Sequence, residues 1–423
     1  MSLAFVNRER ELRELDAAAR SGGLLVVYGR RRVGKTRLLR HWIGSRGGLY
    51  SQAIEAQPEQ QIRQVYQDLR PGLTTDIEPR SWAELLEILT VQKGRWAICL
   101  DEFPYLTAVD SSLPSRLQKW LDHSIPPGCL LILAGSSTRM MNDLFLHQGA
   151  PLYGRARKLL PIQPMDYGAF CRSCRRKPTD PQSFELFACV GGIPRYWEFV
   201  EHGQDAVALA ESLYFDFAPY MEQEPHRILR DEGSAGLNAV AVLEAVGRGA
   251  ARPSEIAAWL GTAQTNLSRL LQQLLDAFIL VRDLPFGESI RSTRKVLYRI
   301  DDPTMRFWFR VFSPHRSLWQ TYPRSQKRKL IHDHASTVFE DVCRSAFPGA
   351  RRYWESDLEL DLVAPDPEDA SGLVVAEVKW KRLTVAEHRR VRRELEETWS
   401  RCALRTKHSR VRFEVLDAGV LER

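Results

Sequence analysis

The chain has 423 residues, a formal charge of +7 and an isoelectric point near 9.0. This length accommodates about three domains, and its composition is that of an ordinary globular protein. No apolar run reaches the roughly 18 residues that span a bilayer, and seven cysteines are too few for a disulfide scaffold. We therefore expect a cytoplasmic protein with free thiols and no membrane partner, whose positive charge favours nucleic acid without establishing it.

The first motif is a phosphate-binding loop between a predicted strand and a predicted helix. The apolar run at 24–28 is followed by GRRRVGKT at 29–36, with the spacing Gly-x4-Gly-Lys-Thr of a P-loop. Backbone N–H groups and a helix N-terminus hold phosphates in such a loop, with Lys35 at the β- and γ-phosphates and Thr36 at Mg²⁺. The alternative is a strand-to-helix turn that merely contains glycines. The predicted cofactor-binding residues are Gly29, Arg30, Arg31, Arg32, Val33, Gly34, Lys35, Thr36 and Arg37.

Strands and helices alternate up to residue 162. Strands are expected at 49–54, 96–100, 129–134 and 158–162, and a capping-box signature predicts that a helix begins near Ser81. This alternation predicts a parallel sheet that is covered by helices on both faces.

Groups suited to nucleotide hydrolysis follow these strands. Asp101 is the candidate Mg²⁺ ligand, and Glu102 beside it is the candidate for polarising the attacking water. Ser136, or its neighbour Ser137, could hydrogen-bond the γ-phosphate or the water. Two loop arginines, Arg155 and Arg195, could neutralise charge at the γ-phosphate, the alternative being that both are simply solvated.

Six motifs occur in order between residues 5 and 217: FVNREREL, GRRRVGKT, WAICLDE, LAGSS, PLYGR and GGIPRYW. Together they resemble the AAA-like P-loop ATPases that are abundant in archaea and also found in bacteria. The resemblance implies an ASCE-type sheet of order 5-1-4-3-2 and Mg²⁺-dependent ATP hydrolysis. It also implies that Val6, Asn7 and Arg8 lie near the adenine and that Ser136 is a sensor. Arg155 would be an arginine finger, in a homo-oligomer if it acts across a subunit boundary.

Helical patterns dominate from 166 to 312. The segment 166–217 is interpreted as a lid of an ATPase domain at 1–225. Helices at 235–246, 253–261 and 265–277 and strands at 278–284 and 295–300 then follow in the order of a winged helix-turn-helix at 226–312. A winged helix used only for packing or protein contacts is the alternative to one that binds double-stranded DNA. The candidate DNA contacts are Gln264, Thr265, Asn266, Ser268, Arg269, Arg291, Arg294 and Lys295.

A basic, Pro- and Ser-containing stretch at 313–335 is predicted to be a linker before an α/β domain at 336–423. In that domain Glu377 and Lys379 share one face of a strand, and Asp361 lies on the preceding strand. With Glu340 on an earlier helix, they resemble the PD-(D/E)XK nuclease core, which implies a restriction-endonuclease-like fold. Asp361 and Glu377 would bind Mg²⁺ or Mn²⁺, and Lys379 would stabilise charge on a phosphodiester. An exposed charged strand, or a degenerate domain that serves only contacts, is the alternative.

The patterns together predict an ATPase that binds DNA and cleaves it with a metal-dependent C-terminal domain. A nucleotide-dependent switch or scaffold that binds protein partners, with a silent C-terminal domain, is the other hypothesis.

Overall fold

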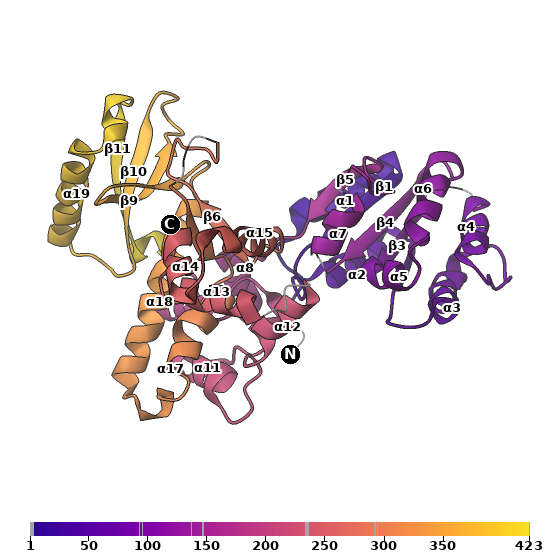
Figure 1. Cartoon of the computed structure of the whole chain (residues 1–423), viewed down its shortest axis with the longest axis horizontal. Coiled ribbons are helices and arrows are strands. Elements are labelled where there is room, and N and C mark those ends of the chain that lie inside the picture. Colours follow the sequence, from indigo (N-terminus) through magenta and orange to yellow (C-terminus); the bar gives the residue numbers. More distant parts are fainter. Residues whose placement is uncertain are drawn as a thin grey trace.

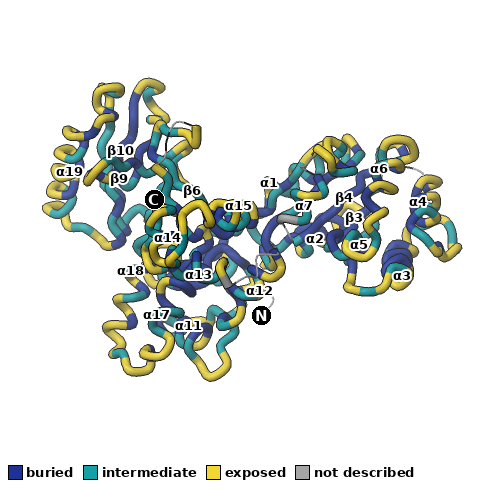
Figure 2. The backbone as a smooth tube through the Cα atoms, in the orientation of Figure 1, coloured by how far each residue is buried: buried dark blue, intermediate teal, exposed yellow. Residues whose placement is uncertain are grey.

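The computed structural model describes residues 4–92, 94, 96–136, 138–145, 148–232, 237–291, 293 and 295–422. Figure 1 shows an N-terminal α/β lobe (residues 4–162), a central helical body (164–345) and a C-terminal α/β lobe (351–422). In Figure 2 the inner strands of both lobes are largely buried, as are parts of the helical body. Among the described residues no helix is long and apolar enough to cross a membrane.

The N-terminal lobe is built on one parallel sheet. Its order is β2-β3-β4-β1-β5, which read from the β5 edge is the order 5-1-4-3-2 that the resemblance implied. The strands are β1 (Gly23–Tyr28), β2 (Leu49–Gln52), β3 (Trp96–Asp101), β4 (Cys129–Gly135) and β5 (Ala156–Pro161).

Helices cover both faces of this sheet because alternate side chains of its buried strands point in opposite directions. Leu25 and Val27 of β1 pack on the side of α1 (Glu9–Ser21) and α2 (Lys35–Arg46). Leu24 and Val26 pack on the other side. The helices of that side are α3 (Pro58–Leu69), α4 (Trp82–Thr90), α5 (Phe103–Val109), α6 (Leu113–His123) and α7 (Thr138–Phe145).

The helical body joins the predicted lid to the segments that follow it. Its helices are α8 (Tyr167–Cys174), α9 (Pro181–Val190), α10 (Pro194–Trp197), α11 (Ala206–Ala210), α12 (Glu224–Asp231), α13 (Leu237–Gly247), α14 (Pro253–Leu260), α15 (Ser268–Asp276), α16 (Pro303–Phe307), α17 (Ser313–His315) and α18 (Arg324–Ser345). It also contains the antiparallel hairpin of β6 (Leu280–Asp283) and β7 (Leu297–Ile300). Three helices followed by a hairpin is the element order predicted for 226–312.

The predicted boundary at 225/226 is wrong, because it falls inside α12 and cuts a single core. Tyr214 of the predicted lid packs against Phe307 at 4.7 Å between ring centroids, and its hydroxyl donates to the carbonyl of Cys189 at 2.8 Å. Helix α9, whose residues from Phe184 to Val190 are largely buried, packs against both α16 and α18. The lid alone could not cover this apolar helix.

The predicted linker at 313–335 is also wrong. Trp319 is completely buried and stacks on Phe215 with 3.9 Å between ring centroids. Helix α18 begins at Arg324, directly after Pro323. The basic residues that suggested a loop pair with the lid instead, as Lys327 does with Glu211 at 2.8 Å.

The C-terminal lobe contains a four-stranded sheet of order β11-β10-β9-β8. Its strands are β8 (Arg351–Glu355), β9 (Leu358–Pro365), β10 (Leu373–Lys379) and β11 (Val411–Asp417). Pairing is antiparallel from β8 to β10, and β11 is parallel to β10 after a crossover through α19 (Val385–Ser400). The second half of α18 packs on β10, so this helix belongs to the helical body and to the C-terminal lobe at once.

Candidate nucleotide and carboxylate sites

The loop at 29–34 has the backbone that its glycines predict. Gly29 has φ 151°, and a Cβ there would lie 2.5 Å from the carbonyl oxygen of Ile162. Gly34 has φ 100° and precedes the first turn of α2. Any other residue at Gly29 would clash with main chain, so the sequence signal at this position has a direct steric cause.

Lys35 is buried at the start of α2. Its Nζ donates to the carbonyls of Gly29 at 2.8 Å and Arg30 at 3.0 Å, across the concave side of the loop. Burial lowers the pKa of Lys35, while the nearby charges of Glu102 and Asp101 oppose this shift. An ammonium held by two carbonyls can be transferred to phosphate oxygens, which are better acceptors.

Asp101 meets Thr36 at the carboxyl end of β3. Its Oδ2 accepts hydrogen bonds from Thr36 Oγ1 at 2.6 Å and from the hydroxyl of Tyr50 at 2.8 Å. A hydroxyl beside a carboxylate offers the oxygen ligands that Mg²⁺ prefers, so Thr36 and Asp101 fit the metal predicted for them. No sequence pattern indicated a role for Tyr50, although its strand was predicted and pairs with β3.

Glu102 and Ser136 also lie together, at the ends of neighbouring strands. Ser136 Oγ donates to a carboxylate oxygen of Glu102 at 2.6 Å, and Glu102 has a left-handed backbone with φ 54°. That conformation is uncommon for a residue other than glycine and is often retained at functional sites. Ser137 lies outside the described residues.

A cavity of about 660 Å³ opens over these groups. Its lining includes Lys35, Thr36, Arg37, Glu102 and Ser136 together with Phe5, Arg40 and His41, which the sequence analysis did not select. Phe5 stacks on His41 with 4.0 Å between ring centroids and supplies an aromatic surface of the kind on which a base can stack.

The residues predicted to lie near the adenine, Val6, Asn7 and Arg8, are not part of that lining. Asn7 donates to Asp166 at 3.1 Å, and buried Arg8 donates to the carbonyl of Val33 at 2.8 Å. Arg8 therefore stabilises the P-loop through a contact with its main chain.

The three arginines inside the P-loop all pair with carboxylates of the helical body, which the sequence did not indicate. The pairs are Arg30 with Asp302 at 3.0 Å, Arg31 with Asp231 at 2.6 Å, and Arg32 with Glu224. The first pair is deeply buried, with 8% and 1% of the two side chains exposed. Arg30 is therefore a structural anchor, whereas Arg31 and Arg32 also line the cavity.

Arg155 lies at the wrong edge of the sheet for a contact with this chain's own γ-phosphate. It directly precedes β5, and the first residue of β5 pairs with Leu24 at the start of β1, whereas the P-loop follows the end of β1. Arg155 pairs with Asp122 of α6 at 2.9 Å and so lowers the pKa of that carboxyl. A role across a subunit boundary stays a prediction.

The role of Arg195 at the γ-phosphate stays a prediction as well. It lies in the first turn of α10, pairs with Glu198 and is exposed. Its charge and that of Arg32 influence each other, which places Arg195 near the P-loop.

The predicted DNA contacts of the third helix are all exposed: Gln264, Thr265, Asn266, Ser268 and Arg269. In the loop of the hairpin, Arg291 and Lys295 are exposed, and Arg294 lies outside the described residues. The hairpin itself docks on the C-terminal lobe, since the N–H of Phe286 donates to the carbonyl of Arg352 at 2.9 Å. The hairpin is therefore held against the C-terminal lobe rather than projecting freely.

The C-terminal carboxylates Glu340, Asp361 and Glu377 lie close enough together to influence one another's pKa. Lys379 Nζ donates to Glu377 at 2.6 Å, and burial raises the pKa of both Asp361 and Glu377. Burial and the charge of Asp361 raise the pKa of Glu340 to about 7. Among the described residues no group of three or more His, Cys, Asp or Glu could hold a metal ion. Asp361 and Glu377 remain a pair of candidate ligands.

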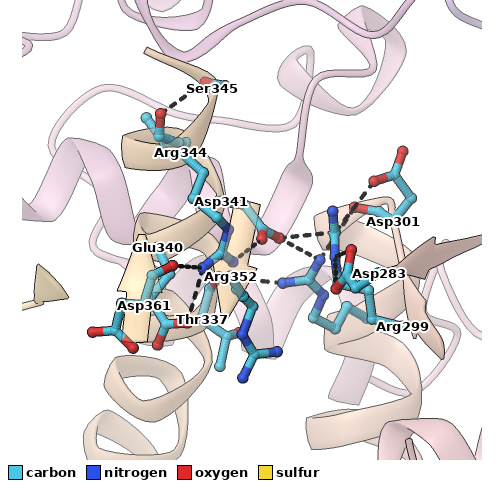
Figure 3. Close-up of polar contacts among 12 residues, drawn as sticks. Asp283, Arg299, Asp301, Thr337, Glu340, Asp341, Arg344, Ser345, Arg352 and Asp361 are labelled. Atoms are coloured by element: carbon cyan, nitrogen blue, oxygen red, sulfur yellow. Dashed lines mark hydrogen bonds and ion pairs between the residues drawn. The ribbon is translucent and has the colours of Figure 1, made fainter. Parts of the chain in front are cut away.

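An arginine lies beside Glu340 and Asp361. Arg344 lies 3.7 Å from Glu340 and donates to the main-chain carbonyl of Asp361 at 3.0 Å, so a guanidinium balances the charge there. Figure 3 shows the guanidinium of Arg344 beside Glu340 of α18 and Asp361 of β9.

Arg344 also belongs to a cluster around Asp341, which we call the Asp341 cluster. Asp341 accepts hydrogen bonds from Arg299 of β7 at 3.1 Å, from Arg306 of α16 at 2.6 Å and from Arg344 at 2.5 Å. Burial alone would raise the pKa of Asp341, but Arg306, Arg299 and Arg344 outweigh it and lower the pKa. Figure 3 shows this cluster joining the hairpin to α18.

Two family models match the chain. Residues 5–200 match an ATPase domain predominantly from Archaea, and residues 308–391 match a family described as archaeal and bacterial proteins of unknown function. The second match starts before the predicted linker and continues into α19, which agrees with the continuous packing of this region.

Two similar proteins cover most of the chain. An uncharacterized protein of Methanocaldococcus jannaschii is 27% identical over 420 residues, covering 92% of this chain and 91% of the relative. The structure of a Walker-type ATPase of Pyrococcus abyssi superposes with a TM-score of 0.54 at 21% identity, covering 73% of this chain and 96% of that one. That likeness shows a shared fold. Taken with the sequence match, these findings mean that residues 5–200 form an archaeal-type P-loop ATPase domain.

Proposed function

We propose that this protein hydrolyses ATP to control how its helical body and C-terminal lobe engage double-stranded DNA. The observation that carries the proposal is that three consecutive P-loop arginines pair with carboxylates of α12 and of the residue before α16. Bound phosphates carry the same charge as those carboxylates. ATP would therefore compete for Arg31 and Arg32 and loosen the contacts that they make with the helical body.

The polar residues of the cavity would have separate roles in hydrolysis. Lys35 would exchange its carbonyl partners for phosphate oxygens, and Ser136 holds Glu102, which would orient the attacking water. Mg²⁺ would be held by Thr36 and Asp101 and would neutralise charge on the phosphates.

ATP turnover tests this assignment. Lys35→Ala should abolish turnover, and Glu102→Gln should retain nucleotide binding while losing turnover. Lys119→Ala, on the exposed surface of α6, is the control and should behave as wild type. Unchanged turnover in both site variants would refute the assignment.

Binding of a DNA duplex tests the second part. The exposed polar start of the third helix and the exposed wing residues support this part, because both can reach a phosphate backbone. In fluorescence anisotropy with a labelled duplex, Arg269→Ala should weaken binding several-fold, whereas Arg63→Ala on α3 should not. Affinity should differ between ADP and a non-hydrolysable ATP analogue, and Asp231→Asn should change that difference. An affinity that does not depend on nucleotide in wild type would exclude the coupling.

For the C-terminal lobe we propose metal-dependent phosphodiesterase activity. The pairing of Glu377 with Lys379 beside Asp361 supports it. A divalent ion would be held by Asp361 and Glu377 and would supply an activated water. The alternative is a silent domain that binds protein partners, which is favoured by the lack of a group of three or more metal-binding side chains among the described residues.

Plasmid nicking separates these two functions. Wild type with Mg²⁺ or Mn²⁺ and ATP should nick supercoiled plasmid faster than Lys379→Ala, while Lys381→Ala, an exposed lysine two residues further on, should match wild type. Equal rates for wild type and Lys379→Ala would favour the silent domain.

A further inference from the structure

A cavity of about 340 Å³ lies between the β6–β7 hairpin and β8 of the C-terminal lobe. Five of its lining residues are arginines, namely Arg282 and Arg299 of the hairpin, Arg344 of α18, and Arg351 and Arg352 of β8. So many arginines on one concave surface repel one another unless an anion lies among them.

The acidic residues of the lining do not balance this charge. Asp283 pairs with Arg299 at 3.0 Å, and Asp341 pairs with Arg299 and Arg344 within its own cluster. Within the described part of the chain, Arg282 and Arg351 have no carboxylate partner. Arg282 donates to the amide oxygen of Gln272 at 3.4 Å, and Arg351 donates to the carbonyl of Glu288 at 3.0 Å. Arg352 pairs with Glu359 outside the lining, which leaves Arg282 and Arg351 as the two arginines of the lining without such a partner among the described residues.

Two guanidinium N–H groups of this lining also lack an acceptor. The Nε atoms of Arg282 and Arg352 are buried and have no hydrogen-bond partner. A buried charged donor without an acceptor is costly, and an anion with several oxygens is the ligand that can satisfy such donors.

We propose that this cavity binds phosphate groups of a nucleic-acid strand. Guanidinium groups match the geometry of phosphate oxygens. Exposed Arg291 and Lys295 continue the basic surface along the hairpin loop, as a strand with several phosphates requires. Arg344 lines the cavity and contacts the main chain of Asp361, so a phosphate bound here lies beside the C-terminal carboxylates. As regards the nucleic acid, this inference depends on the proposed function.

The double variant Arg282→Gln/Arg351→Gln tests the site, with Arg63→Gln/Arg116→Gln on exposed arginines of the N-terminal lobe as the matched control. Binding of a labelled DNA duplex is measured by anisotropy at several salt concentrations. The double variant should bind about tenfold more weakly, and the slope of log K against log salt should fall by about two, one for each lost phosphate contact. ATP turnover should not change, which shows that the ATPase domain is intact.

A second probe is inorganic phosphate, added to wild-type and double-variant sequences that both carry Lys35→Ala so that the P-loop does not contribute. One outcome is that phosphate raises the Tm of the Lys35→Ala protein but not that of the double variant, while the protein does not bind duplex. This result would assign the site to a free phosphorylated ligand. The DNA part of the proposed function would then fail while the site stands. Duplex binding with an unchanged slope in the double variant would overturn the site while leaving DNA binding in place. Binding of neither probe would overturn both.

Discussion

The Asp341 cluster provides a sharp test of how the helical body and the C-terminal lobe are joined. Asp341→Asn keeps the shape of the side chain but removes the charge that three arginines share. Arg299 would keep Asp283 and Asp301, whereas Arg306 would lose its only carboxylate partner among the described residues. The side chain of Arg306 is 10% exposed, so water cannot replace that partner. Leaving a buried charge unpaired costs about 3–5 kcal/mol. Because Arg299 keeps two of its partners, the expected loss in the free energy of unfolding is at the lower end of this range, about 3 kcal/mol.

Urea unfolding measures this loss, with Asp333→Asn on the same helix as control. Asp333 pairs with Lys329 at 2.9 Å, but the side chains are 46% and 76% exposed, so that pair contributes less than about 1 kcal/mol. Adding Arg306→Met to Asp341→Asn removes the stranded charge and should recover part of the stability. Equal destabilisation by the two aspartate substitutions, or no recovery in the double variant, would refute the reasoning.

Two further predictions concern the core of the helical body. Burial lowers the pKa of His334 to about 3, so folding disfavours its protonated form and stability falls as the pH drops below about 6.5, by about 2 kcal/mol at pH 5. His334→Gln, which keeps an N–H donor for the carbonyl of Ala188, should therefore lose less Tm than wild type between about pH 7.5 and pH 5; equal losses would contradict the prediction. Trp319→Ala should destabilise the protein by about 3–5 kcal/mol in thermal unfolding because the indole is fully buried against Phe215, whereas a residue in a linker would tolerate the change.

The central residues of the candidate nucleotide site could be brought together from the sequence because they are close along the chain or end neighbouring strands. Gly29, Lys35 and Thr36 lie within eight residues, and Asp101 ends a strand whose apolar run is legible on its own. The carboxyl ends of parallel strands lie at the same edge of a sheet, so the order of the strands is enough to bring Ser136 and Glu102 together.

Contacts between distant segments could not be predicted in this way. The partners of the P-loop arginines, such as Asp231 and Asp302, lie about two hundred or more residues away, and nothing in a single charged residue identifies its partner. The linker prediction failed for a related reason. Basic residues and prolines are typical of loops, but Pro323 directly precedes a helix whose Arg324 and Lys327 pair with carboxylates of the predicted lid.

Helix α18 has a mechanical consequence. Its 22 residues run without interruption from the helical body into the C-terminal lobe, with His334 buried near Ala188 and Phe339 packed against Trp380. A helix of this size is about 33 Å long and stiff, so a tilt of about 10° at one end displaces the other by about 6 Å. A rearrangement of the helical body that tilts α18 by this amount would therefore move the C-terminal lobe by more than the width of a phosphate group.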